Sequence, residues 1–324
     1  MCDMKNSNDR TLFHGVVDIR EEDGFLLPLR FTEKQYIRYL DLPRCPYPYA
    51  TAGVELDFLT DADEISFRYR TKEVWNWWEN SDPCFDLYEN GRFASFYPIA
   101  AKGGTVTYRC RSVEKQKRIT VYFPGNATVE IAPISFGNAA PTAERKRKFL
   151  VLGDSISQGL MGNSASFSYA QIVKRFFDAE MLNVSVGGDC FDVSALDADN
   201  GFAPTDILIA LGTNDTYFIK DHDVILPNMI AYLETVKELY PSADITVISP
   251  PWLTDAETTS VEQFAGICRL TDDIRRTAER LALRFICGND VVPHDARFFS
   301  DTAHPNDLGF AQYALSVIKC LLTD

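Results

Sequence analysis

The spacing of hydrophobic residues changes near the middle of the chain. Up to about residue 136, short runs alternate apolar and polar residues, as strands with one buried face do, and Asn, Asp and Gly turn residues separate them. The run 31–43 differs, because Thr32 can cap a helix there. This half is therefore predicted to be an all-β sandwich or jelly roll that contains one helix. The predicted strand-rich runs are residues 54–70, 85–96, 104–112 and 117–136.

The second half alternates continuous apolar runs with amphipathic helical patterns. Continuous apolar runs of strand length are typical of parallel strands that are covered on both faces. We therefore expect an α/β domain with a doubly wound parallel sheet of flavodoxin-like strand order. The predicted strands are 148–154, 181–187, 206–212, 244–250 and 283–288, and the predicted helices are 167–180, 223–240, 261–282 and 305–322.

A stretch rich in small, proline and then basic residues separates the two patterns, at residues 137–148. We place the domain boundary there. The expected domains are an N-terminal β module at residues 1–140 and an α/β domain at residues 146–324.

Composition and charge exclude several classes of partner. The formal net charge of -14 would repel a phosphate backbone, so nucleic acid is not an expected partner. The chain begins without an apolar leader and has no apolar run long enough to span a bilayer. The eight cysteines include no C-x-x-C pair, which argues against a zinc site or a disulfide scaffold. We expect an unprocessed cytoplasmic protein with no membrane association, no metal and no cofactor.

Candidate catalytic residues lie where the first three predicted strands of the α/β domain end. Ser155 follows the first strand, Gly188 the second and Asn214 the third, and the carboxyl ends of parallel strands share one rim of the sheet. Asp301 and His304 lie three residues apart in the loop before the last helix, which can fold back over this rim. Five polar or flexible positions are thus expected to converge.

These residue types meet the requirements of acyl transfer. A serine hydroxyl needs a base to remove its proton, and His304 can serve while Asp301 orients its imidazole. The N–H groups of Ser155 and Gly188, with the side-chain amide of Asn214, can stabilise a developing oxyanion.

Each feature also has an ordinary structural interpretation. Gly-Asp-Ser and Gly-x-Asn-Asp are common turns, and His304 could be a surface histidine. The other histidines, at positions 14, 222 and 294, are alternative bases, although His222 between two aspartates is more typical of a solvated charge cluster. The order of the pieces at successive strand ends favours the functional interpretation.

Four segments, "GDSIS", "GGD", "GTND" and "DTAHP", resemble the sequence blocks of the SGNH, or GDSL-type, serine hydrolases. The resemblance covers about the last 180 residues and implies Ser155 as nucleophile and Asp301 with His304 as its partners. It also implies Gly188 and Asn214 as oxyanion donors, with Gly188 fitting the block better than its neighbour Gly187.

The N-terminal half resembles the jelly-roll module of two-domain carbohydrate esterases. "CFDLYENGRF" is close to the module's pattern, but Cys84 stands where the family tends to have glycine, which leaves the subfamily open. Such enzymes remove acetyl groups from sugars. The expected function is therefore a serine esterase for short acyl esters on a carbohydrate, with a small-molecule or oligosaccharide ester as substrate.

Tryptophans support a sugar substrate, because flat rings are good platforms for sugar faces. Trp75, Trp77 and Trp78 cluster in the β module, where packing is an equal alternative, and Trp252 follows the fourth predicted strand. Trp252 and Asp154 are the candidate substrate contacts, although Asp154 also suits the role of fixing the turn.

Two alternatives to the carbohydrate esterase stay open: a lysophospholipase or thioesterase, and a carbohydrate-binding protein without catalysis. The sequence leaves the oligomeric state open, a homo-oligomer included.

Overall fold

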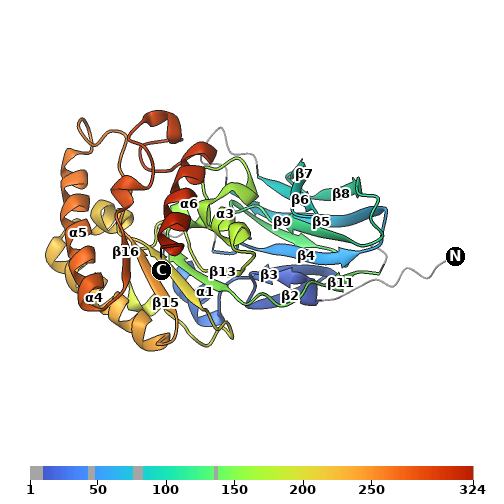
Figure 1. The fold of residues 1–324 in the computed structure, drawn as a ribbon, viewed down its shortest axis with the longest axis horizontal. Helices are drawn as coiled ribbons and strands as arrows, with labels where there is room; N and C mark the ends of the chain where they lie inside the picture. Colours follow the sequence, from blue (N-terminus) through green and yellow to red (C-terminus); the bar gives the residue numbers. More distant parts are fainter. Residues whose placement is uncertain (1–9, 43–47, 76–82, 135–137, 324) are drawn as a thin grey trace.

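The computed structural model describes residues 10–42, 48–75, 83–134 and 138–323. Antiparallel sheets occupy one end of the molecule, and a parallel sheet with helices on both faces occupies the other (Figure 1). The last residues that pair with the antiparallel sheets are Ala140 and Pro141, and the parallel sheet starts at Lys148. The change in hydrophobic period therefore coincides with a change of architecture.

The N-terminal part is a sandwich of two antiparallel sheets, as the sequence predicts. One sheet has the order β1-β4-β9-β6-β7 with β11 paired to β4, and the other has the order β2-β3-β10-β5-β8. Side chains from both sheets, such as Phe58, Phe85 and Val129, form one buried core between them. The strands are β1 (Phe13–His14), β2 (Asp18–Glu22), β3 (Phe25–Leu29), β4 (Glu55–Thr60), β5 (Glu64–Val74), β6 (Cys84–Glu89), β7 (Arg92–Pro98), β8 (Gly104–Arg109), β9 (Lys117–Tyr122), β10 (Ala127–Ile131) and β11 (Ala140–Pro141).

The C-terminal part is a five-stranded parallel sheet in the order β13-β12-β14-β15-β16. In chain order this is 2-1-3-4-5, so the predicted flavodoxin-like order is confirmed. The strands are β12 (Lys148–Gly153), β13 (Glu180–Asn183), β14 (Asp206–Ala210), β15 (Asp244–Ile248) and β16 (Arg284–Ile286). The helices are α2 (Ser155–Gln158), α3 (Tyr169–Phe176), α4 (His222–Leu239), α5 (Val261–Arg280) and α6 (Asp307–Leu321).

Alternate residues of β12 pack on opposite faces of this sheet, which explains why the strand is apolar throughout. Leu150 and Leu152 join the core beneath α4 and α5, whereas Phe149 and Val151 join the core beneath α3 and α6. Burying both faces fixes the sheet as a rigid base for the loops at its carboxyl edge.

The predicted N-terminal helix forms as α1 (Glu33–Leu40). Thr32 caps it, and Gln35 completes a capping box by accepting from the Thr32 N–H. Its Tyr36 and Tyr39 do not join the core of the sandwich; they pack in the core beneath α4 and α5. The segment before α1 also contacts the parallel-sheet half. Its buried Arg30 guanidinium donates to the Asn183 carbonyl oxygen at 2.6 Å. The segment 27–40 thus belongs in part to the parallel-sheet half.

Buried charges also join the two parts. Arg145 lies between them and pairs with Asp57 of β4 and, at 2.9 Å, with Glu180 of β13. Lys174 of α3 pairs with Glu55 of β4. Burial opposes ionisation of Asp57, but the neighbouring Arg118 and Arg145 outweigh it and lower the pKa of Asp57 to about 2.

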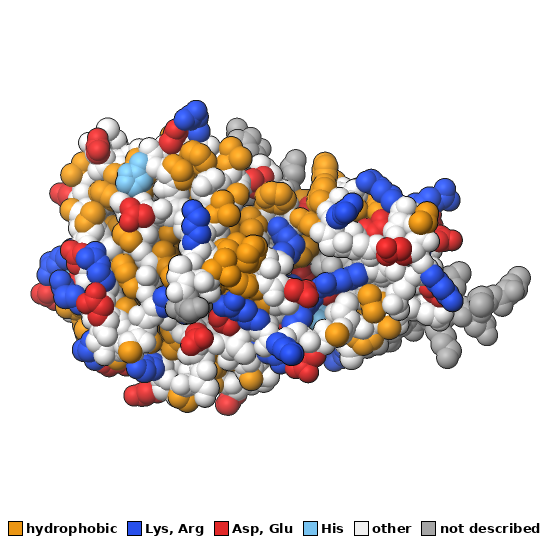
Figure 2. All heavy atoms as spheres, viewed as in Figure 1, with side chains coloured by type: hydrophobic (Ala, Val, Ile, Leu, Met, Phe, Trp, Pro, Cys, Tyr) orange, Lys and Arg blue, Asp and Glu red, His pale blue; other side chains and the backbone are white. Residues whose placement is uncertain are grey.

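Acidic and basic side chains intersperse on the visible surface of both parts, and hydrophobic side chains gather near the middle, around α3 and α6 (Figure 2). No described helix has the length and apolar character needed to cross a membrane. Within the described ranges, no group of three or more His, Cys, Asp or Glu side chains is arranged to hold a metal ion.

Candidate active site

Ser155 stands at the junction of a buried strand and a short helix. β12 ends at Gly153, and the Asp154 carboxylate caps α2 by accepting from the Ile156 N–H at 3.0 Å. Ser155 is the first residue of α2, so its own N–H has no partner inside the helix. The apolar strand and its cap therefore present the Ser155 hydroxyl and N–H together at the carboxyl edge of the sheet.

His304 and Asp301 lie within hydrogen-bond distance of this serine. The Ser155 Oγ is 2.7 Å from His304 Nε2, and His304 Nδ1 is 2.8 Å from an Asp301 carboxylate oxygen. The other oxygen of Asp301 accepts from the N–H groups of Ala303 and His304, at 2.8 and 2.7 Å. The structure thus brings the three predicted residues into one hydrogen-bonded chain.

The Asp301 carboxylate is suited to remain charged beside the imidazole. Burial opposes its ionisation, but hydrogen bonds from the His304 side chain and from two backbone N–H groups outweigh it and lower the pKa of Asp301. A charged carboxylate at Nδ1 fixes the tautomer in which Nε2 can accept the serine proton.

The two glycines of the second block have different roles. The Gly187 N–H already donates to the Gln158 side chain at 2.7 Å. Gly188 has a φ of +82°, which favours glycine, and it lines the same cavity as Ser155. The N–H of Gly188, the residue chosen from the sequence, is therefore the one of the two that is open to a ligand.

The Asn214 side chain is held beside these groups. Its Nδ2 donates to the Asp189 carbonyl oxygen at 3.1 Å and lies 3.4 Å from the Asp154 carboxylate. Asn214 also lines the cavity with Ser155 and Gly188. The three predicted oxyanion donors consequently surround one space.

This space is a cavity of about 570 Å³ whose wall is shared between the two parts of the molecule. Trp75, directly after β5 of the sandwich, is buried and packs with Leu160 and Met161. A Cβ on Gly187 would come within 3.1 Å of the Trp75 ring, so glycine permits this close approach. Trp77 and Trp78 lie outside the described residues.

The two candidate substrate contacts do not line the cavity as described. Trp252 stacks on His294, with ring centroids 4.9 Å apart, and meets Phe299 edge-on. Asp154 is buried beneath the serine as the cap of α2. The expectation that Trp252 contacts the substrate is thus corrected: it follows β15, but it is not among the described residues that line the cavity, and its half-buried ring packs against His294 and Phe299.

The alternative histidines are engaged elsewhere. His14 pairs with Glu180 at 2.8 Å, between the two parts of the molecule. His222 pairs with Asp273 of α5 at 2.9 Å, and His294 contacts the Asn289 carbonyl oxygen at 2.7 Å. Only His304, of the four histidines, is among the described residues around the cavity.

An aromatic pair that sequence reasoning missed stands at the cavity mouth. Tyr217 and Phe218 belong to the π-helical turn Asp215–Ile219, and 57% and 47% of their respective surfaces are exposed. Their rings meet edge to face with centroids 4.9 Å apart, and both line the cavity. They come two and three residues after the third block, which places them near the rim of the sheet without showing where their rings point.

The predicted catalytic residues of this site lie within the part of the chain that matches a known protein family. The model of the GDSL-like lipase/acylhydrolase family matches residues 151–312, a range that holds the serine, the two oxyanion loops and the aspartate-histidine loop. The chain belongs to the GDSL-like lipase/acylhydrolase family. Among curated proteins, no relative matches it.

Solved structures extend the likeness of this acylhydrolase to both parts of the chain. A salicylyl-acyltransferase from a tetracycline biosynthetic pathway is 17% identical, with a TM-score of 0.80 over 95% of this chain and 93% of that one. A family two carbohydrate esterase from Clostridium thermocellum, solved with cellohexaose, is 18% identical, with a TM-score of 0.64 over 91% and 97% of the two chains. An acetyl xylan esterase from Butyrivibrio proteoclasticus is 18% identical, with a TM-score of 0.58 over 85% and 91%. At these identities, the likeness establishes the fold.

Proposed function

We propose that this acylhydrolase is a serine esterase that removes short acyl groups, acetyl above all, from a carbohydrate through an acyl-Ser155 intermediate. The observation that carries the proposal is the hydrogen-bonded chain from Ser155 through His304 to Asp301, at 2.7 and 2.8 Å, on the wall of an open cavity. This is the arrangement that makes a serine hydroxyl nucleophilic.

In the first step, Ser155 Oγ forms a bond to the ester carbonyl carbon while His304 Nε2 takes the hydroxyl proton. The negative charge that develops on the carbonyl oxygen is stabilised by the N–H groups of Ser155 and Gly188 and by Asn214 Nδ2. The bond to the leaving alkoxide then breaks, and His304 returns the proton to it, which releases the sugar as an alcohol.

Water then hydrolyses the acyl-Ser155 ester, with His304 again acting first as base and then as acid. His304 Nε2 takes a proton from water as its oxygen attacks the acyl carbon, and the proton passes to Ser155 Oγ when the acyl-serine bond breaks. The carboxylic acid leaves and the hydroxyl is restored. Asp301 stays ionised throughout and stabilises the imidazolium that forms in each step.

Two features support a carbohydrate with a short acyl group. Tyr217 and Phe218 offer exposed rings at the mouth, and Trp75 closes the wall behind Gly187. Aromatic faces suit sugar rings. Solved structures of similar fold include an acetyl xylan esterase and a carbohydrate esterase with bound cellohexaose.

Transfer of the acyl group to an acceptor other than water is the second candidate. The observation that favours it is the TM-score of 0.80 with a salicylyl-acyltransferase over 95% of this chain. Both reactions share the acyl-Ser155 intermediate, so the products distinguish them. Free acid accumulates in hydrolysis, and a new ester of an added alcohol accumulates in transfer.

Substitution of the nucleophile tests the proposal. We expect Ser155→Ala to abolish hydrolysis of 4-nitrophenyl acetate, and Ser316→Ala, whose hydroxyl contacts the Val291 carbonyl oxygen outside the cavity, to leave it intact. The measurement is nitrophenolate release together with acetate release from a panel of acetylated saccharides. Full activity of Ser155→Ala would exclude the proposed nucleophile.

Chain length separates the acetyl esterase from a lysophospholipase or thioesterase. We expect kcat/KM for 4-nitrophenyl esters to fall from acetate to octanoate. A maximum at long acyl chains would reject the short-acyl proposal, and tight sugar binding without turnover of any ester would point to a carbohydrate-binding protein.

A further inference from the structure

A second cavity, of about 770 Å³, adjoins the catalytic one. Tyr217, Ser260 and Gln263 line both, so the two cavities are neighbours that share these residues. The second cavity lies between the π-helical turn with the start of α4 and the first half of α5. A substrate held at Ser155 could therefore extend past Tyr217 into it.

Two cations line the second cavity without partners of their own. Lys220 and Arg269 are exposed, and neither side chain is paired within the described part of the chain. Glu262 is the one carboxylate among the described lining residues. In a protein with a formal net charge of -14, this excess of positive charge beside the catalytic cavity is a local exception.

The backbone holds Lys220 in place. Its φ of +63° is an unfavourable conformation for a residue with a side chain, and its N–H closes the π-helical turn by donating to the Asp215 carbonyl oxygen at 3.0 Å. The same turn carries Tyr217 and Phe218. One short element thus sets both the aromatic mouth of the first cavity and a cation of the second.

His222 also lines the second cavity, but its ring already has a partner. His222 pairs with Asp273 of α5 at 2.9 Å, behind the cavity. It therefore serves as support for the wall, and the charge open to a ligand comes from Lys220 and Arg269. The start of α5 adds donors, because Val261 and Gln263 line the cavity and the N-cap Ser260 makes no side-chain hydrogen bond to the helix.

We propose that the second cavity binds an anionic group, a carboxylate or a sulfate, on the saccharide whose acyl ester is held at Ser155, with Lys220 and Arg269 as its charge partners. This inference rests on the proposed function and narrows its substrate class to acylated acidic sugars. The ester binds in the first cavity, the ring beside Tyr217, and the anion in the second.

Matched substrates test the proposal. One set comprises an acetylated disaccharide with a uronate on the second sugar, its sulfated counterpart, and the neutral twin in which the carboxyl group is reduced to an alcohol. We expect the unmodified protein to have a kcat/KM up to about tenfold higher for an anionic member than for the neutral twin, in low salt, because Lys220 and Arg269 together contribute two exposed charge contacts. The ratio should fall towards one in 0.5 M NaCl, because salt screens exposed charges.

Variants assign the preference to this cavity. We expect the double variant Lys220→Gln and Arg269→Gln to reduce the anionic-to-neutral ratio up to about tenfold, through KM. Lys319→Gln, an exposed cation of the last turn of α6 that lines neither cavity, is the matched control and should keep the ratio. Comparison of the uronate with the sulfate shows which anion is preferred.

The outcomes are distinct. A ratio of one in the unmodified protein, or a high ratio that the double variant leaves intact, would overturn the anionic subsite while the esterase stands. Failure of the unmodified protein to release acetate from all three saccharides and from 4-nitrophenyl acetate would overturn the proposed function, and the subsite with it.

Discussion

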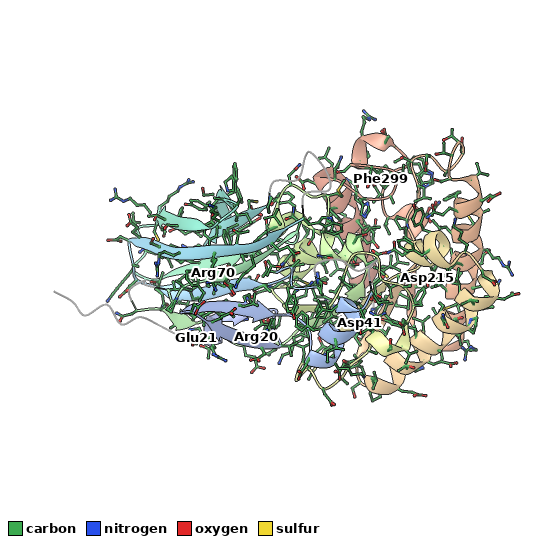
Figure 3. The ribbon with its side chains drawn as sticks, turned by 180° about the vertical axis from the view of Figure 1, so that it is seen from behind. Arg20, Glu21, Asp41, Arg70, Asp215 and Phe299 are labelled. Carbon is green, nitrogen blue, oxygen red and sulfur yellow. The ribbon has the colours of Figure 1, made fainter. Side chains whose placement is uncertain are left out.

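Asn214 lies among three buried acidic residues: its Nδ2 is 3.4 Å from the Asp154 carboxylate and donates to the Asp189 carbonyl oxygen, and Asp215 follows it in the chain. Burial raises the pKa of all three, to about 6 for Asp154 and about 7 for Asp215, where neighbouring carboxylates add to the effect. Asp215, labelled in Figure 3, is the fully buried member that follows Asn214 directly. One of its oxygens accepts from the Phe191 N–H at 3.1 Å.

The raised pKa of Asp215 predicts a stability loss towards alkaline pH. Between its unfolded pKa near 4 and its folded pKa of about 7, the folded state binds more protons than the unfolded state, so the free energy of unfolding falls as pH rises. Asp215→Asn removes the proton while it keeps the acceptor for Phe191. From pH 5 to pH 8 we expect the unmodified protein to lose about 2 kcal/mol more than Asp215→Asn does.

Urea unfolding at both pH values provides the measurement. Asp199→Asn, at an exposed turn, is the control and should follow the unmodified protein. Equal pH dependence of Asp215→Asn and the unmodified protein would show that Asp215 ionises normally.

At the scale of single residues, the local sequence was enough to predict the site residues that lie at strand ends. Ser155, Gly188 and Asn214 follow apolar strands directly, so the parallel sheet alone predicts that they meet. Trp252 also follows a strand, but its ring turns towards His294, because side-chain direction in a loop depends on neighbours distant in sequence. For the same reason, Tyr217 and Phe218 could not be assigned to the cavity.

Helix α1 connects the N-terminal half to the oxyanion loops. Arg38 donates to the Asp189 carboxylate at 3.0 Å and to Asp192 at 3.0 Å, and Tyr39 donates to the other oxygen of Asp189 at 2.9 Å. Asp189 follows Gly188, and its carbonyl oxygen accepts from Asn214. Arg38 is therefore a positioning residue for two oxyanion donors that it does not touch.

Loss of this contact is expected to lower turnover more than substrate binding. Arg38→Ala should reduce kcat for 4-nitrophenyl acetate about tenfold with little change in KM, because small displacements of catalytic donors are costly. Arg38→Lys should recover part of the loss. Lys34→Ala, on the same helix, is the matched control, since Lys34 only reaches the Leu196 carbonyl oxygen at 3.4 Å. An unchanged kcat in folded Arg38→Ala would remove the positioning role.

At the scale of elements, hydrophobic period predicted the strands and helices and their order in the parallel sheet. The capping residue of α1 was also readable, because capping is local. The core against which α1 packs could not be predicted, because an apolar face on an eight-residue helix indicates that the helix is buried but not which elements it contacts. The pairing order of the antiparallel strands depends likewise on contacts far apart in sequence.

For the molecule as a whole, the buried ion pairs around Arg145 predict that the two halves unfold together. Arg145→Met leaves Glu180 and Asp57 with fewer partners in a buried site, which should cost about 3 kcal/mol. Lys148→Met removes only a partly exposed pair with Glu144 and should cost about 0.5 kcal/mol or less. Urea unfolding followed by far-ultraviolet circular dichroism and tryptophan fluorescence measures both; similar losses in the two variants would contradict the network's role.

The shared core beneath α4 and α5 also affects how the chain is made. Leu27, Leu29 and Tyr39 leave the ribosome about 200 residues before Met229 and Leu233 of α4, against which this core closes. At roughly 5–20 residues per second, that interval lasts about 10–40 s. Until then this core is incomplete, although Leu150, Leu182 and Phe191 of the same core are made earlier. A nascent chain stalled before α4 is therefore expected to expose part of this apolar core and to be prone to aggregation.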